Sequence, residues 1–122
     1  VLIVSVSAIL LVAKNVSSFD MFGSNDNECV PYNVFVEKGS KDYSVNISWS
    51  TKNKCFSFVQ YGLDEKSINM IGVDSSSSSK SKEHLVVLEK VSPIDRYFFL
   101  INSDNQTYGN NGIPLEFSFS NL

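Results

Sequence analysis

Apolar and polar residues alternate strictly over segment 43–49, which is the pattern of a strand buried on one side. Because successive side chains of a β-strand point to opposite faces, Val45, Ile47 and Trp49 fall on one face, which we expect to be the core. Six further short apolar runs occur at 34–36, 56–61, 68–73, 84–88, 97–101 and 115–119. Residues that favour turns separate these runs. Seven short strands at this spacing predict an all-β sandwich.

Composition limits the classes of protein that fit this pattern. The 122 residues correspond to about one domain. Hydrophobic residues make up 43% of the chain, which is enough to form a core. The net charge of −3 and the lack of a Lys/Arg cluster argue against a nucleic-acid partner.

The segment from Val91 through Pro93 to Tyr97, leading into an alternating strand, resembles the E-to-F corner of fibronectin type III domains. Segments 47–49 and 59–62 resemble the second and third strands of that family, and 84–88 is similar to the H-x-V-x-L of the fibronectin-like domain in purple acid phosphatases. The resemblance implies a seven-stranded fibronectin type III/Ig-like sandwich framed by Trp49, Pro93 and Tyr97, with Tyr97 bonded to the upstream backbone.

The only two cysteines, Cys29 and Cys55, cannot complete a zinc site by themselves, and the single histidine lies far along the chain. Two free thiols remain an alternative, but we favour a disulfide, which implies an oxidising compartment outside the cytoplasm. Asn15, Asn46 and Asn105 begin Asn-x-Ser/Thr triplets and are candidate glycosylation sites, although chance also explains them in a chain rich in Asn and Ser.

The pattern of ionisable residues does not indicate catalysis. Carboxylates are scattered, mostly over predicted loops, and we interpret them as solvated surface; they include Asp42, Asp64, Glu65, Asp74, Glu83, Glu89, Asp95, Asp104 and Glu116. His84 begins a predicted strand on its inner face, which indicates a partly buried structural histidine. We therefore predict no catalytic, cofactor-binding or metal-binding residues, and no enzyme.

Strand register predicts an apolar patch on one sheet. If Tyr97 and Phe99 face the core, then Phe98 and Leu100 face outward. The fibronectin-like register places Val59 and Tyr61 inside, which turns Phe56 and Phe58 outward. These four outward residues predict a contact patch for another chain, unless a tail or loop of the same chain covers it.

The first 13 residues carry no charge. On a helix their apolar side chains would cover every side. A helix that spans a bilayer needs about 20 such residues, so this segment is short. The apolar residues of the segment include Val1, Leu2, Ile3, Val4, Val6, Ile9, Leu10, Leu11 and Val12. The segment looks like the N-terminal helix of type IV pilins and pseudopilins, without their usual Phe and Glu. The resemblance implies a helix over 1–14 that waits in the membrane and then packs into a filament, a linker over 15–28, and a sandwich over 29–122.

These observations lead us to expect a structural subunit of an extracellular surface filament, which assembles with copies of itself through the helix and needs no cofactor. The main alternative is a membrane-anchored binding or adhesion module that recognises a surface partner or glycan. A third interpretation is an accessory domain of a larger hydrolase.

Overall fold

The computed structural model of the chain describes residues 28–75 and 79–122. The predicted helix over 1–14, the linker up to residue 27 and the candidate glycosylation site Asn15 lie outside these residues. Within them the chain forms eight strands and one short 3-10 helix: β1 (Tyr32–Lys38), β2 (Val45–Cys55), β3 (Ser57–Gly62), β4 (Met70–Val73), β5 (Ser81–Leu88), β6 (Arg96–Ser103), β7 (Gln106–Tyr108), β8 (Leu115–Ser118) and η1 (Phe119–Asn121).

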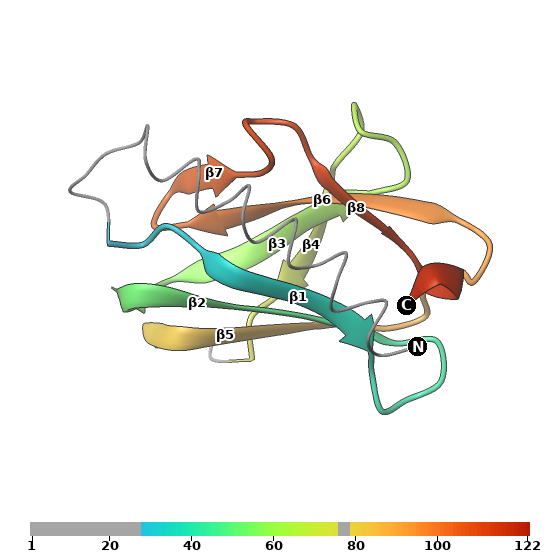
Figure 1. The fold of residues 1–122 in the computed structure, drawn as a ribbon, viewed down its shortest axis with the longest axis horizontal. Helices are drawn as coiled ribbons and strands as arrows, with labels where there is room; N and C mark the ends of the chain where they lie inside the picture. The colour runs from blue at the N-terminus through green and yellow to red at the C-terminus, as the bar shows by residue number, and fades with distance from the viewer. Residues whose placement is uncertain (1–27, 76–78) are drawn as a thin grey trace.

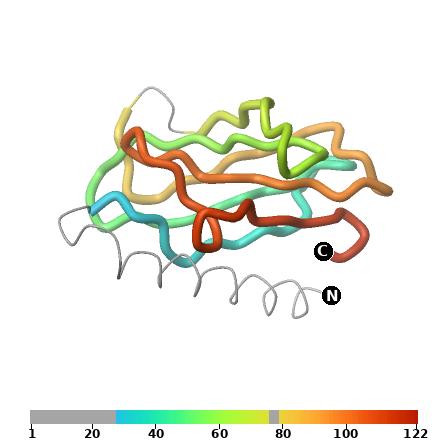
Figure 2. The backbone as a smooth tube through the Cα atoms, turned by 90° about the horizontal axis from the view of Figure 1, so that it is seen from above, coloured from blue at the N-terminus to red at the C-terminus, as the bar shows by residue number. Residues whose placement is uncertain are grey.

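The strands form two antiparallel sheets, which lie face to face (Figure 1). Sheet A has the order β1-β2-β5, and sheet B has the order β4-β3-β6-β7, with β8 also paired to β6. Seen from above, the strands of both sheets run along the long axis of the domain (Figure 2). The described part of the chain is therefore mostly β, with a sandwich-like arrangement.

One core fills the space between the sheets. The predicted inward residues Val45, Ile47 and Trp49 are all buried, which confirms the alternation that identified this strand. Apolar side chains of both sheets pack around these three residues, because each strand presents every second residue to the opposite sheet. The other core residues include Val34, Val36, Val86 and Leu88 from sheet A and Val59, Phe99, Ile101, Leu115 and Phe117 from sheet B.

The prediction of seven strands is wrong, because segment 102–112 contains the strand β7 and is not only a loop. Asp104 and Asn105 both have positive φ, 51° and 66°, as a tight two-residue hairpin turn requires. The turn folds β7 back onto β6, so that Tyr108 pairs with Ile101 and is buried. A three-residue strand with one apolar residue carries too little alternation to be recognised from sequence.

The turn-favouring residues between the predicted strands 43–49 and 56–61 do not end the first of them, since β2 continues to Cys55. Lys52, Asn53 and Lys54 have exposed side chains, which explains why a polar sequence is compatible with a strand there. The pairing with β5 is irregular between Ser50 and Cys55, so the regular alternation ends before the strand does.

A disulfide joins Cys29 to Cys55, as predicted, with the two Cα atoms 5.9 Å apart. It ties the segment ahead of β1 to the end of β2. Ser103 on sheet B adds a second link, because its Oγ donates a 2.6 Å hydrogen bond to the carbonyl oxygen of Cys29. This end of the domain is thus held by a covalent bridge and by hydrogen bonds that do not involve sulfur.

At the corner ahead of β6, the backbone N–H of Ser92 donates a 2.8 Å hydrogen bond to the hydroxyl of Tyr97. The Tyr97 ring stacks on Phe117 of β8, with ring centres 5.3 Å apart. The same residue therefore fixes the corner and contributes an aromatic surface to the core.

Candidate functional site

The outer side of sheet B carries an apolar surface drawn from three neighbouring strands. The register pairs Phe58 with Val73 and Gln60 with both Ile71 and Leu100, so these side chains share the side opposite the core. Ile71 and Val73 are exposed, and the others are half-buried. We call this surface the apolar face; it consists of Phe58, Ile71, Val73, Phe98 and Leu100.

The apolar face overlaps the predicted contact patch but is not identical to it. Phe58, Phe98 and Leu100 lie on it, whereas Phe56 lies in the link between β2 and β3, exposed, with Lys80 Nζ 5.7 Å from its ring centre. Sequence reasoning missed Ile71 and Val73, although they alternate around Gly72.

Gly72 explains why β4 turns these two residues outward. A side chain at this position would come within 2.7 Å of Val86 and 2.8 Å of Leu88, so the inner side of β4 lies directly against sheet A. Only glycine allows this close approach, and Ile71 and Val73 must therefore point away from the core.

The edge strand of sheet B next to the apolar face is short and uncharged. β4 is the last strand in the order of sheet B, and its sequence, Met70–Val73, contains neither a charge nor a proline. Natural edge strands commonly use such residues to prevent pairing with another chain. Met70, Ile71 and Val73 are all exposed here, which makes this edge and the apolar face one continuous candidate contact surface.

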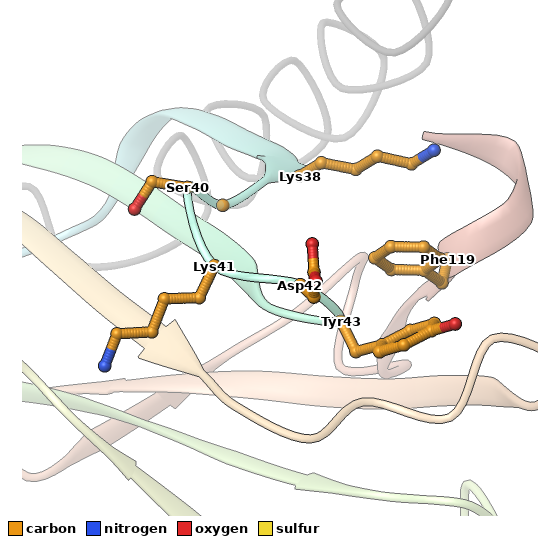
Figure 3. A pocket seen from close by; sticks show the side chains of 7 residues that line it. Lys38, Ser40, Lys41, Asp42, Tyr43 and Phe119 are labelled. Atoms are coloured by element: carbon orange, nitrogen blue, oxygen red, sulfur yellow. The ribbon is translucent and has the colours of Figure 1, made fainter.

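A second candidate site is a pocket at the end of the domain where the β1–β2 loop meets η1 (Figure 3). Its volume is about 370 Å³, within the range of about 300–1,000 Å³ found for small-molecule sites. The pocket is lined by Lys38, Gly39, Ser40, Lys41, Asp42, Tyr43 and Phe119. None of these residues belonged to a site predicted from sequence, because the pocket depends on bringing the chain's last residues beside this loop.

The interior contains a buried polar array that the sequence did not reveal. His84 Nδ1 lies 2.6 Å from Asp74 Oδ2, and His84 Nε2 lies 2.9 Å from Thr51 Oγ1. The imidazole also stacks on the indole of Trp49, with ring centres 5.3 Å apart. The interpretation of Asp74 as solvated surface is wrong, since only 3% of it is exposed, and His84 is fully rather than partly buried.

The order hydroxyl, imidazole, carboxylate is that of a hydrolytic triad, but burial gives this array a different role. Thr51, His84 and Asp74 are all closed off from solvent, so a substrate has no access to the hydroxyl. Asp74 follows β4 of sheet B, whereas His84 and Thr51 belong to sheet A. The array therefore links the two sheets by hydrogen bonds at the point where β4 ends.

The candidate glycosylation sites within the described residues differ in position. Asn105 is exposed at the turn between β6 and β7. Asn46 lies in the middle of β2 and is only half-exposed on the outer side of sheet A. Of these two, Asn105 has the more accessible side chain.

Among residues 28–75 and 79–122, no group of three or more metal-ligating side chains comes together. The same residues include no helix long and apolar enough to cross a membrane.

Burial raises the pKa of Tyr61, and the neighbouring Tyr97 adds to the effect.

Comparisons with known proteins do not place the chain in a family: no family model matches it, and no curated protein is found to be similar.

Proposed function

We propose that this chain is a structural subunit of an extracellular surface filament. The hydrophobic segment 1–13 packs against the same segment of neighbouring copies, and the two-sheet domain is displayed on the outside. A membrane holds the subunit before assembly. The observation that carries the proposal is the apolar face of sheet B with its uncharged edge strand, which would supply a contact between the domains of neighbouring subunits.

Three further features support this proposal. The Cys29–Cys55 disulfide is expected of a protein that works in an oxidising compartment. The sheet order and the hydrogen bond at Tyr97 support a fibronectin type III-like arrangement, a scaffold common among displayed domains. Such a scaffold does not specify a function, which depends on the residues at the surface.

The occupant that we propose for the apolar face is a second copy of this chain. The linker over 15–28 has 14 residues, and an extended chain of this length spans at most about 50 Å. Packed hydrophobic segments would therefore keep the domains of neighbouring copies close together. Opposite charges lie side by side on this side of sheet B, where the side chains of Arg96 and Glu116 approach to 3.3 Å. The same surface of two copies can therefore meet without net repulsion.

Negative-stain microscopy of the full chain tests the assembly. We expect filaments from the full chain and none from a variant lacking residues 1–14, with far-UV circular dichroism verifying that the variant still folds. A full-length point variant, Leu10→Asp, should also abolish filaments, because an unpaired carboxylate within packed apolar segments is strongly unfavourable. If the full chain is monomeric and only partitions into detergent, the filament proposal is wrong.

The contact through the apolar face is tested separately with matched substitutions on two edge strands. Ile71→Asp places a charge on the apolar face, whereas Val87→Asp places the same charge on the outer side of sheet A, at a residue that is also exposed. We expect the first variant to give few or short filaments and the second to assemble normally. Equal assembly of both variants would show that the apolar face is not a subunit contact.

A membrane-anchored binding module is the second candidate function, and the pocket beside η1 is the observation that favours it. In that case segment 1–13 serves as a lipid anchor, and the domain recognises a ligand at the surface. The microscopy experiment separates the two functions, since an anchored module remains monomeric in detergent.

A further inference from the structure

A strained tyrosine lies on the wall of the pocket beside η1. Tyr43 has φ of 56°, in the left-handed region that bulky side chains rarely adopt. Its side chain is 52% exposed, with its ring centre 5.7 Å from that of Phe119. The turn between β1 and β2 imposes this φ, and the turn leaves the tyrosine ring at the surface of a concave site, where aromatic side chains commonly contact ligands.

The loop that carries Tyr43 is fixed by its own hydrogen bonds. The N–H of Gly39 donates to the carbonyl oxygen of Ser44 over 2.8 Å, and Ser44 Oγ donates to that of Lys41 over 2.6 Å. Val91, outside the loop, donates its N–H to the carbonyl oxygen of Tyr43 over 2.8 Å. The pocket wall is thus formed before any ligand arrives, which lowers the entropic cost of binding.

The charges around the pocket indicate which ligand chemistry fits. Lys41 points away from the pocket and pairs with Glu89 at 3.3 Å (Figure 3). Lys38 Nζ lies 4.8 Å from the centre of the Phe119 ring, and the Asp42 side chain rises between Lys38 and Tyr43. One cation and one anion thus face the same space, which favours neither a phosphate nor an ammonium group.

We propose that this pocket binds one ring of a neutral carbohydrate. The C–H face of a pyranose packs on an aromatic surface, here Phe119 and Tyr43, whose rings are tilted by 42° to each other. Hydroxyl groups of the sugar donate to the Asp42 carboxylate and accept from the Lys38 ammonium, and the Tyr43 hydroxyl can do either. This inference goes beyond the proposed filament and does not depend on it, since an anchored module would carry the same pocket.

Saturation-transfer NMR on the full chain tests the proposal, because it observes the ligand and works with filaments as well as with monomers. The probes are the methyl glycosides of glucose, galactose, mannose and N-acetylglucosamine, in a detergent without a sugar head group. We expect transfer to at least one glycoside, strongest at protons of one ring face. No transfer to any of the four would overturn the proposal.

Variants locate the binding. Phe119→Ala should weaken it about tenfold through lost ring stacking. Phe119 also packs against the core, so its removal could lower stability as well as binding. Tyr43→Gly is therefore a second test, because it removes an aromatic ring of the pocket and glycine adopts the positive φ of this position without strain. It should lose binding while unfolding at a similar denaturant concentration to the wild-type chain. Tyr32→Ala, at another exposed tyrosine, is the control and should bind normally.

Two results would contradict the assignment. Transfer that persists in both Phe119→Ala and Tyr43→Gly would place the sugar elsewhere. Phosphorus-31 line broadening of inorganic phosphate by the wild-type chain, but not by Lys38→Ala, would make the pocket an anion site instead.

Discussion

Removal of the disulfide should lower the free energy of unfolding by an amount that follows from the loop it closes. Cys29 and Cys55 are separated by 26 positions in the sequence. A cross-link of this span removes conformational entropy from the unfolded chain worth about 3.5 kcal/mol at 25 °C. Typical domains have a stability of about 5–15 kcal/mol, so the loss is a large fraction of the total.

The folded state itself should change little when the bridge is removed. The hydrogen bond from Ser103 to the carbonyl oxygen of Cys29 and that from the N–H of Asn53 to the carbonyl oxygen of Glu28 do not involve sulfur. They keep the segment ahead of β1 in place. The effect of the bridge therefore resides mainly in the unfolded chain, which expands when the constraint is lost.

The assay is urea unfolding of the full chain and of the Cys29→Ala/Cys55→Ala double variant, followed by circular dichroism. We expect a lower midpoint and a steeper dependence of unfolding free energy on urea, because the unfolded variant exposes more surface. Wild-type chain treated with a reductant should behave like the variant. A loss below about 1 kcal/mol would refute the chain-entropy reasoning, and an unchanged urea dependence would contradict the expansion of the unfolded chain.

Three further predictions concern the interior. Asp74→Ala should destabilise by about 3 kcal/mol, because it leaves Nδ1 of the buried His84 ring without its hydrogen-bond partner; a loss below about 1 kcal/mol in urea unfolding would contradict the role of this contact. Tyr97→Phe should cost about 1 kcal/mol through the lost hydrogen bond from Ser92, and equal urea midpoints would contradict this. Unfolded chains release the Tyr61 proton near pH 10.0, whereas the folded chain, with its raised pKa, retains it to higher pH. Stability should therefore fall as pH rises above 10.0, and less so in Tyr61→Phe, as measured by thermal unfolding in alkaline buffers.

Patterns with a local cause could be predicted from the sequence. Alternation identified Val45, Ile47 and Trp49 as inward-facing, because a strand that is buried on one side must repeat every second residue. The same rule placed Phe98 and Leu100 on the outer side of sheet B. It failed at β7, where a strand of three residues is too short to show a period.

Other features depend on how strands meet, which no local pattern records. Asp74 resembled any other loop carboxylate in the sequence, and only the crossing of β4 towards sheet A brings it to His84. Ile71 and Val73 became part of the apolar face because Gly72 allows β4 to lie directly on Val86 and Leu88. These contacts depend on the distance between two sheets.

The division of the chain into short strands around an apolar core follows from the amino-acid order alone, because a strand that buries one side needs an apolar residue at every second position. The amino-acid order also placed two cysteines where a disulfide forms. Which polar groups are buried together, and where a concave site forms, depends on contacts between strands that are distant in the chain. The pocket is an example, since Tyr43 and Phe119 lie at distant positions of the chain and meet only when the sheets close.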